Sequence, residues 1–326
     1  MRRVSLPIAI YASVALGAAL TGCGGPAETG SFDKTLTVSG PIRLELSNAS
    51  GAVKINAGPD AEVKIHADVR AHGFLFSNAK ETLDNLVSNP PIEQRDDVVR
   101  VGKNLGSFKN ASIDYTITVP RGTEVASTVA SGSQTVAGLR GPVKLESASG
   151  SIRVEHIERN TQVSSLSGSI EVQDIGDDVR VQNASGNVRV SNVKGDSRVK
   201  TLSGSLELQN PGGRAEVGSA SGSVVVRGAS NDVKADCVSG TVDVQGNPAA
   251  TSYWDLRTTS GSVLLTVPGS ANFYLTAESA SGDIQTDIPI VIEEQGKHSL
   301  RAHIGNGGGR VEVHTASGQI RVRGGN

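Results

Sequence analysis

The sequence is poor in the residues that build disulfide scaffolds and nucleic-acid surfaces. It holds 2 cysteines, 1 tryptophan and only 3% aromatic residues in 326 positions. So few cysteines exclude a disulfide framework, and so few rings exclude the stacking platforms of single-strand binders. The 31 basic and 33 acidic residues nearly cancel, so nothing in the charge balance predicts a nucleic-acid partner.

Patterns that hold metals, phosphates or catalytic nucleophiles are also missing. The glycine-rich run 305–309 is not followed by Lys-Ser/Thr, which a phosphate loop requires, so it predicts an ordinary loop. The histidines show no paired metal-ligand spacing on one strand; they are His66, His72, His156, His298, His303 and His314. We therefore expect a non-enzymatic protein without catalytic residues, metal or cofactor.

Long apolar runs are absent except at the N-terminus. Two arginines precede the apolar stretch 6–20, and Leu20-Thr21-Gly22-Cys23 resembles a bacterial lipobox. This pattern predicts a signal peptide over 1–22, acylation of the Cys23 sulfur and a lipidated tether over 23–33. Two or three acyl chains would hold such a protein stably on a membrane.

The location of the anchor is open at this point. Gly24 rather than aspartate follows the cysteine, so retention in an inner membrane is not signalled. We expect a protein of the cell envelope, at the outer membrane and facing the periplasm or the cell surface. An ordinary secretory signal in which Cys23 is incidental is the alternative.

What the sequence does have is a repeat. Between Ser131 and Ser239, seven Ser-Gly pairs recur with a constant period of 18, beginning at Ser131, Ser149, Ser167, Ser185, Ser203, Ser221 and Ser239. Further pairs begin at Ser260, Ser281 and Ser317. A fixed period of this size is typical of a solenoid, in which equivalent coils stack on one another.

Each coil alternates apolar and charged residues, which we number by their offset from the serine of each pair. Offsets 3, 5, 8, 12, 14 and 17 hold 33 apolar residues among 36, proline included, and offsets 4, 6, 13 and 15 hold 14 charged residues among 24. Alternation with period two predicts strands with one buried face. Because 12, 14 and 17 repeat 3, 5 and 8 half a coil later, we expect two equivalent strands per coil and six inward columns.

The corners have their own signature. Offset 1 is always glycine, and offset 10 is glycine, aspartate or asparagine in five of six coils, so we expect positive φ angles at both. The serine at offset 0 is expected to bond the corner backbone. Cys237 stands at offset 16, where other coils carry serine, asparagine or threonine, and is interpreted as a serine substitute in a ladder.

A column of alternating charge at offset 4 is the nearest thing to an enzyme site. It contains Arg153, Glu171, Arg189, Glu207 and Asp243. Solvated strand faces do not separate the pKa values of two carboxylates, as acid and base roles require. We interpret the column as a ladder of ion pairs.

Outside the regular coils of 131–239, strand patterns over 35–69 predict the first coils. The stretch 72–111 is an insertion with a short capped helix that ends at Asn89-Pro90-Pro91 and a further strand over 98–101. An irregular loop is expected over 289–309 and the last strands over 310–323. The whole is predicted as an all-β parallel β-solenoid (β-helix) over 34–326, with about 18 residues and two main strands per coil and one short helix.

Three stretches resemble the bacterial adhesin family of β-strand repeats, which is catalogued as a domain of unknown function. They are Ile113–Thr123, the Ser-Ala-Ser-Gly and Ser-Leu-Ser-Gly repeats, and Ala280–Ile284 leading to Pro289. The resemblance covers 34–326. It implies a parallel β-solenoid in the cell envelope, with a role in adhesion or envelope stress, and it implies no catalytic residues.

The sequence favours a lipid-anchored binding or adhesin-like scaffold whose partners are the membrane, through Cys23, and an envelope glycan or membrane protein. An envelope-stress or regulatory lipoprotein that contacts a membrane signalling protein is one alternative, and a glycan-active β-helix enzyme is another. The loops 72–111 and 289–309 are expected to carry specificity. The one concentration of aromatic residues supplies candidate ligand contacts, with burial in the core as the other interpretation: Tyr253, Trp254, Phe273 and Tyr274.

Overall fold

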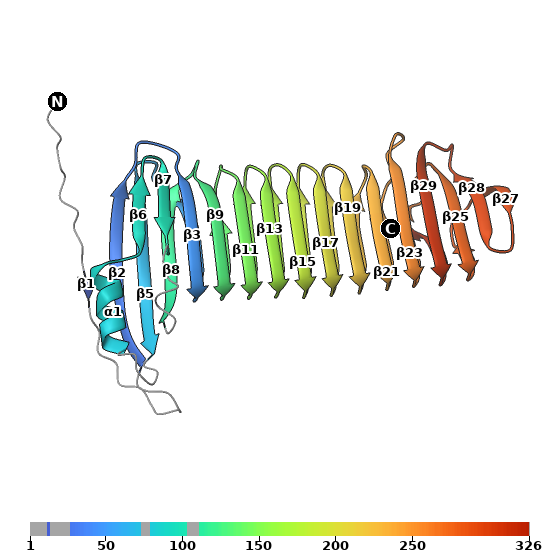
Figure 1. Ribbon diagram of the computed structural model, residues 1–326. Coiled ribbons are helices and arrows are strands. Elements are labelled where there is room, and N and C mark those ends of the chain that lie inside the picture. Colours follow the sequence, from blue (N-terminus) through green and yellow to red (C-terminus); the bar gives the residue numbers. More distant parts are fainter. Residues whose placement is uncertain (1–11, 14–26, 73–78, 103–110, 326) are drawn as a thin grey trace. The chain divides into compact units, whose positions relative to one another are not determined.

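The computed structural model describes residues 12–13, 27–72, 79–102 and 111–325. These residues form strands and one helix, α1 (Ala79–Ser88), as Figure 1 shows. The chain divides into two compact units, Met1–Glu158 and Arg159–Asn326. In each unit the coils pair into two mostly parallel sheets, which confirms the predicted all-β parallel β-solenoid. We call the sheet of the first half-turns sheet A and that of the second half-turns sheet B.

Unit 159–326 holds the regular coils. In spatial order its part of sheet A consists of β14 (Ile170–Ile175), β16 (Val188–Val193), β18 (Leu206–Pro211), β20 (Val224–Ala229), β22 (Val242–Gly246), β24 (Val263–Pro268), β30 (Ile320–Gly325) and β26 (Ile284–Thr286). Its part of sheet B consists of β13 (Thr161–Ser167), β15 (Val179–Ser185), β17 (Ser197–Ser203), β19 (Ala215–Ser221), β21 (Val233–Ser239), β23 (Tyr253–Ser260), β29 (Gly309–Ser317), β25 (Phe273–Ser281), β28 (Ser299–Ile304) and β27 (Val291–Gln295).

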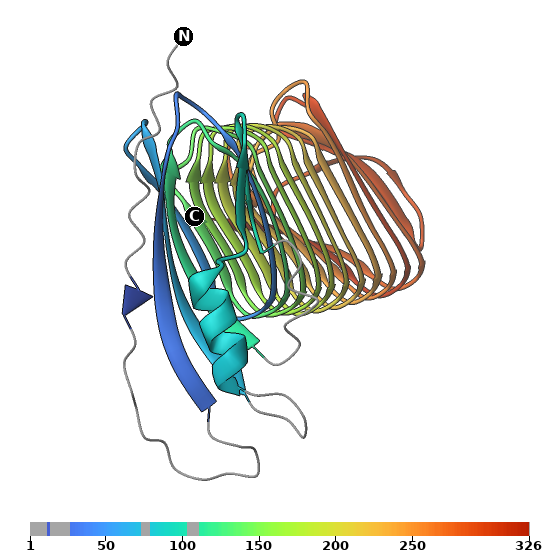
Figure 2. The same ribbon diagram turned by 60° about the vertical axis from the view of Figure 1, so that its left-hand side comes forward.

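The Ser-Gly corners of this unit lie in one file. Strand register places Ser167 beside Ser185, and each later corner beside the next: Ser203, Ser221, Ser239, Ser260, Ser317 and Ser281. Figure 2 shows the nested coils that result. At Gly204, φ is +120°, and an added Cβ would lie 2.3 Å from the carbonyl oxygen of Gly186. Glycine is required there by both conformation and close approach.

Five of the six predicted inward columns are buried, and the sixth is not. Offsets 3, 5, 8, 12 and 14 face the core, as Ile170, Val172 and Ile175 show in β14. At offset 17 the prediction is wrong: Leu166 and Leu202 are 65% and 64% exposed. The two half-turns are therefore not equivalent.

A left-handed residue in the first half-turn explains the difference. Positive φ occurs at offset 7, at Asp174 (57°), Asn192 (55°) and Asn210 (49°), and not at offset 10 as the sequence suggested. This residue breaks the alternation, so that offset 8 turns inward after offset 5. The second half-turn has no such residue, so its alternation continues through 12, 14 and 16 and leaves offset 17 outside.

Offset 16 therefore supplies the polar ladder that the sequence assigned to the serine at offset 0. Its side chains are buried and donate to corner carbonyls: Asn183 Nδ2 lies 3.2 Å from the oxygen of Gly168, and Thr201 Oγ1 lies 3.2 Å from that of Ser203. Cys237 Sγ makes the same contact with Gly222 at 3.4 Å. Cys237 thus takes the place of a serine in a ladder, as predicted.

The coils from residue 253 onward do not follow chain order. Strand β29 lies between β23 and β25, so the last strands of the chain are inserted between two earlier coils. The predicted loop over 289–309 instead contains the antiparallel pair β27 and β28, which extends sheet B past β25. No pattern of period 18 announces this return, because the insertion is made between coils and not within one.

Unit 1–158 begins the two sheets differently. Its part of sheet A runs β1 (Ala12–Ser13), β2 (Ala27–Thr37), β5 (Glu62–His72), β8 (Ala111–Pro120), β4 (Val53–Gly58), β10 (Gln134–Ala137) and β12 (Ile152–Ile157). Its part of sheet B runs β6 (Ile92–Arg95), β7 (Val98–Val101), β3 (Arg43–Ser50), β9 (Glu124–Ser131) and β11 (Val143–Ser149). Of the strands expected as first coils, only β3 and β4 pair in the parallel manner of a coil.

Strands β2 and β5 are long and antiparallel. Because β2 begins at Ala27, residues 27–33 belong to a sheet and not to the predicted tether. The predicted helix of the insertion is confirmed as α1, whose Leu83 and Leu86 are buried against these two strands. Gly30 leaves room for Leu83, since an added Cβ would lie 3.2 Å from its Cδ1.

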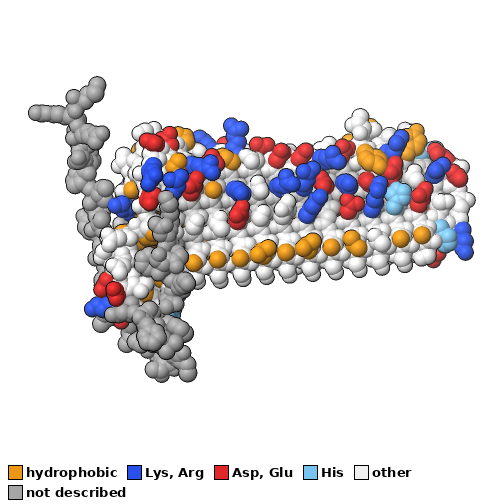
Figure 3. Space-filling view, in the orientation of Figure 1, with side chains coloured by type: hydrophobic (Ala, Val, Ile, Leu, Met, Phe, Trp, Pro, Cys, Tyr) orange, Lys and Arg blue, Asp and Glu red, His pale blue; other side chains and the backbone are white. Residues whose placement is uncertain are grey.

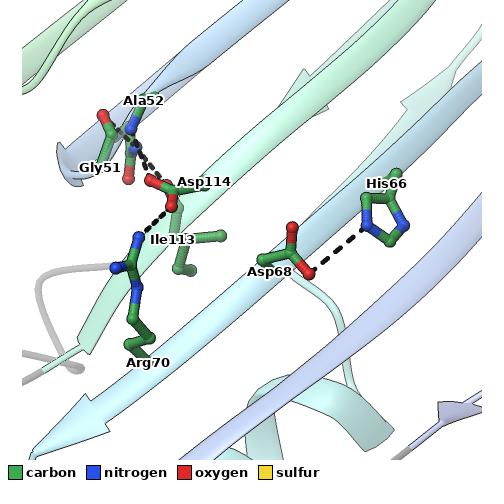
Figure 4. A network of polar contacts seen from close by, with 8 residues as sticks. Gly51, Ala52, His66, Asp68, Arg70, Ile113 and Asp114 are labelled. Atoms are coloured by element: carbon green, nitrogen blue, oxygen red, sulfur yellow. Dashed lines mark hydrogen bonds and ion pairs between the residues drawn. The ribbon is translucent and has the colours of Figure 1, made fainter.

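A polar network fixes the corner where β8 enters sheet A (Figure 4). Asp114 accepts a hydrogen bond from the backbone nitrogen of Ala52 at 2.7 Å and pairs with Arg70. His66 Nε2 lies 3.5 Å from Asp68, and its Nδ1 lies 2.8 Å from Asp33 on β2. The hydrogen bond with Asp33 raises the pKa of His66, against the opposing effect of burial.

Candidate binding face

The four candidate aromatic residues separate into two classes. Trp254 and Phe273 are fully buried, and Trp254 Nε1 donates to the carbonyl oxygen of Asn231 at 2.7 Å. These two belong to the core, so they are removed from the candidate surface. Tyr253 and Tyr274 are 40% and 47% exposed, and they point outward because they directly precede or follow an inward residue on their strands.

Register brings the two tyrosines onto one row of sheet B. Arg310 of β29 pairs with Tyr253 on one side and with Tyr274 on the other. Two strand spacings separate the rings by about 9.6 Å, with the guanidinium of Arg310 between them. We call Tyr253, Arg310 and Tyr274 the tyrosine row.

Neighbouring groups hold the rings in place. Tyr253 Oη donates to Glu312 Oε2 at 2.6 Å, and this bond to a carboxylate raises the pKa of Tyr253 to about 12. Tyr274 packs edge-on against His303, with ring centroids 6.2 Å apart. The backbone at Gly307 also lies against Tyr274, since an added Cβ would be 2.6 Å from its Cζ.

Arg310 differs from the other arginines nearby. Arg257 pairs with Asp255 at 2.6 Å and Arg301 pairs with Glu294 at 3.0 Å. Among the described residues no carboxylate pairs with Arg310, which is exposed. The tyrosine row therefore offers two partly exposed rings and one available positive charge.

A groove of about 890 Å³ runs along the same sheet, between the outward columns at offsets 15 and 17. One wall is polar and includes Lys200, Asp236 and Arg257, and the other is apolar and includes Leu202 and Val238. Gly218 stands in the polar column, so the wall is interrupted there. The sequence reasoning missed this groove because it placed offset 17 inside; the signal available was the polar residue at offset 16.

In the charged column of sheet A, Arg189 pairs with Glu207 as expected, whereas Asp243 pairs with Arg227 of the neighbouring outward column at offset 6. Arg189 Nη2 lies 2.8 Å from Glu207, and Arg227 Nη2 lies 2.9 Å from Asp243. The pKa of Glu207 is lowered, first by a hydrogen bond from Gln209 and then by Arg189.

The remaining candidates from the sequence are a metal site, the lipidated Cys23 and the thiol of Cys237. In the part of the chain that the structure describes, no group of three or more His, Cys, Asp and Glu side chains is arranged to hold a metal ion. Cys23 lies outside the described residues. No described helix has both the length and the apolar character needed to cross a membrane. Cys237 is a buried free thiol whose pKa is raised by burial.

The chain matches the Toastrack DUF4097 family over residues 42–214 and again over 162–323. It belongs to that family. Two successive matches agree with a repeated architecture, and the family is one of β-solenoid-like repeats without an established activity, which fits a scaffold better than an enzyme.

One solved structure aligns with most of this chain. The crystal structure of a "putative cell adhesion protein from Clostridium sporogenes ATCC 15579" aligns with 90% of this chain and 99% of its own, at 12% identity. Its TM-score of 0.20 is too low to support an argument about fold or function. No curated protein matches the chain.

Proposed function

We propose that this protein is a lipid-anchored, non-enzymatic scaffold of the cell envelope that binds an acidic glycan through the tyrosine row. The observation that supports the proposal is the exposed Tyr253–Arg310–Tyr274 arrangement on a rigid sheet. Tyrosine rings offer flat apolar faces with a polar tip, and sugar rings stack on such faces.

The spacing and charge of the row define the ligand class. The two rings lie about 9.6 Å apart, and this separation is close to the length of one disaccharide unit in an extended chain. The available guanidinium of Arg310 between them suits a carboxylate on that unit, because arginine recognises carboxylates in a bidentate manner. A polysaccharide that contains uronic acids has both features.

The anchor is the second part of the proposal. The lipobox at residues 20–23 supports acylation of Cys23 and placement at the outer membrane. Mass spectrometry of the N-terminal peptide from the mature protein is expected to show a diacylglyceryl cysteine. An unmodified Cys23 would contradict this part and leave the glycan site untouched.

Binding to an array of envelope glycans tests the site. Tyr274→Ala is expected to weaken binding to uronate-containing glycans at least tenfold, and Arg310→Gln is expected to remove the preference for acidic over neutral chains. Tyr253→Phe is the matched control, since it keeps the ring and loses only the hydrogen bond with Glu312.

Three outcomes would contradict the proposal. Binding that is equal in Tyr274→Ala and wild type would exclude the tyrosine row. Release of reducing sugars would favour a glycan-active enzyme. Capture of one membrane protein in the absence of glycan would favour the regulatory lipoprotein.

A further inference from the structure

The tyrosine row continues on the strands beyond Tyr274. Register places His303 of β28 beside Tyr274, and Val291 of β27 beside His303. Directly paired residues of neighbouring strands lie on the same face of a sheet, so both share the outward face with the tyrosines. Figure 3 shows this face, on which histidine side chains lie among charged side chains near the last strands. We call Tyr253, Arg310, Tyr274, His303 and Val291 the extended row.

Two kinds of side chain alternate along the extended row. Tyr253, Tyr274 and Val291 present apolar surface to solvent, since they are 40%, 47% and 55% exposed. Arg310 and His303 stand between them and carry nitrogen donors. Neighbouring strands are about 4.8 Å apart, so each kind of side chain recurs about every 9.6 Å.

The ring of His303 is oriented by its neighbours. Its Nδ1 lies 3.2 Å from Glu293 Oε1, and its ring meets that of Tyr274 edge-on, with 62° between the two planes. Among the described residues, Nε2 of His303 has no hydrogen-bond partner. Because Nδ1 is directed at Glu293, Nε2 is the atom that is left to bind a ligand.

We infer that His303 is a second carboxylate-binding subsite, one disaccharide unit away from Arg310. The extended row would then take a polysaccharide with one uronate in every two sugars. This inference rests on the proposed function. Two cationic side chains about 9.6 Å apart match carboxylates on alternate sugars, and the apolar side chains between them match the faces of the uncharged sugars.

A chain with a carboxylate on every sugar fits the extended row less well. Alternate carboxylates would then lie over Tyr253 and Tyr274. The face of an aromatic ring is the negative part of its quadrupole, and Glu312 adds a carboxylate beside Tyr253. The extended row therefore selects an alternating copolymer over a chain made only of uronates.

The charge of the second subsite depends on pH. Histidine is the side chain that gains a positive charge between pH 5 and 8. Glu293 of β27 and Tyr274 of β25 face His303, and Arg301 on its own strand is paired with Glu294 at 3.0 Å. Once the imidazole is protonated, both nitrogens donate, so that Nδ1 bonds Glu293 and Nε2 bonds the carboxylate of the ligand. Carboxylates, whose ordinary pKa lies near 4, stay ionised at pH 5.5, so binding strengthens as the pH falls.

Calorimetry of the full chain tests the subsite with oligosaccharides of alternating glucuronate and N-acetylglucosamine. The tetrasaccharide is expected to bind at least tenfold more tightly at pH 5.5 than at pH 7.5, because it reaches both cations. The disaccharide reaches one cation, and its affinity is expected to change by less than twofold. Tetramannuronate has the same length and a carboxylate on every sugar, and it is expected to bind less tightly than the alternating tetrasaccharide at pH 5.5.

Two variants at the subsite sharpen the test. His303→Gln never gains a charge, so it should lose the pH dependence of tetrasaccharide binding and keep the affinity for the disaccharide. His303→Lys is charged at both pH values, and at pH 7.5 it should bind the tetrasaccharide as tightly as wild type does at pH 5.5. His314→Gln is the matched control, since His314 lies on the same sheet between Glu278 and Glu312, outside the extended row.

The opposite results separate this inference from the proposed function. A tetrasaccharide affinity that is equal at the two pH values, or a pH effect that persists in His303→Gln, would overturn the second subsite and leave the tyrosine row as proposed. Tighter binding of tetramannuronate would also overturn it, because charge density and not the repeat would then be selected. Disaccharide binding that is unchanged in Tyr274→Ala would contradict the proposed function, and a lack of binding by every oligosaccharide would overturn both.

Discussion

The two halves of one coil are made from nearly the same pattern and end differently. In the first half, the left-handed Asn192 turns the chain and Val193 enters the core. In the second half, the strand stays extended, Thr201 enters the core at offset 16, and Leu202 is left outside. In the regular coils the left-handed angle at offset 7 therefore decides which residue of the first half turns inward, and the second half, without it, leaves its last apolar residue outside.

The difference also separates two kinds of polar ladder. Sheet A is joined at its bend by exposed amides, as Asn192 Nδ2 donates to Asp174 at 2.8 Å and Asn210 Nδ2 donates to Asn192 at 2.9 Å. Sheet B is closed by buried groups such as Asn183, which donates to corner carbonyls. A buried ladder is the more costly one to interrupt, because its acceptors cannot turn to water.

The largest expected difference in stability is between two aspartate substitutions, one in the first half of a coil and one in the second. Val190→Asp buries a carboxylate among aliphatic side chains, since Val190 is fully buried. We expect it to lower the free energy of unfolding by more than about 4 kcal/mol. Leu202→Asp is the matched variant on the exposed column and is expected to change it by less than about 0.5 kcal/mol.

Urea denaturation of dilute protein measures both values. Equal destabilisation by the two aspartates would show that offset 17 faces inward in solution. It would remove the basis for the comparison of the two halves.

A smaller loss of stability is expected from substitutions at the two kinds of bend, which are the glycine corner at offset 1 and the left-handed residue at offset 7. Gly204→Ala places a Cβ 2.3 Å from the carbonyl oxygen of Gly186 at a φ of +120°, and should cost about 2 to 4 kcal/mol. Asn192→Ala introduces no steric clash, but the alanine must adopt a φ of 55° without the hydrogen bonds of the amide ladder. It should lower the free energy of unfolding by about 1 to 2 kcal/mol.

Asn192→Gly separates the two contributions at the bend. It removes the amide ladder and relieves the backbone, so its midpoint in thermal unfolding should lie between wild type and Asn192→Ala. A glycine variant less stable than the alanine variant would mean that the left-handed angle is not the source of strain.

The smallest expected change in stability comes from removing one outward-facing carboxylate, that of Glu216. Lys200, followed by Arg198, lowers the pKa of Glu216 on sheet B below its usual value near 4.5. A lowered folded pKa gives stability that is present above the unfolded value and is lost as pH falls through the folded value. Glu216→Gln should therefore cost under about 1 kcal/mol at pH 7 and flatten the acid limb of stability below pH 4.5. An unchanged acid limb would show that this ion pair contributes nothing.

The sequence predicted the class of fold and most of the core. The 18-residue period and the alternation of apolar and polar residues both follow from which side chains face the core and which face solvent. Ile152, Val172 and Leu208 are buried where the pattern requires it. It failed at offset 7 and offset 17, since asparagine or aspartate at one position does not reveal its φ angle, and a leucine beside a corner looks the same inside or outside.

The candidate site was less predictable than the core. Tyr253 and Trp254 are adjacent, and only the register of β23 shows which one is exposed. Arg310 lies far from Tyr253 along the chain, and it reaches the tyrosine row because β29 returns between β23 and β25. Non-local pairing of this kind leaves no periodic trace in one sequence.

The left-handed residue at offset 7 of the regular coils also constrains how such a protein can lengthen during evolution. A duplication of one whole coil copies one bent and one straight half and keeps every later strand on its own sheet. A duplication of a single half would join two bent or two straight halves, exchange the sheets of all that follows, and move the glycine corners out of file. Growth by whole coils is thus imposed by the backbone, although the hydrophobic pattern alone would tolerate half a coil.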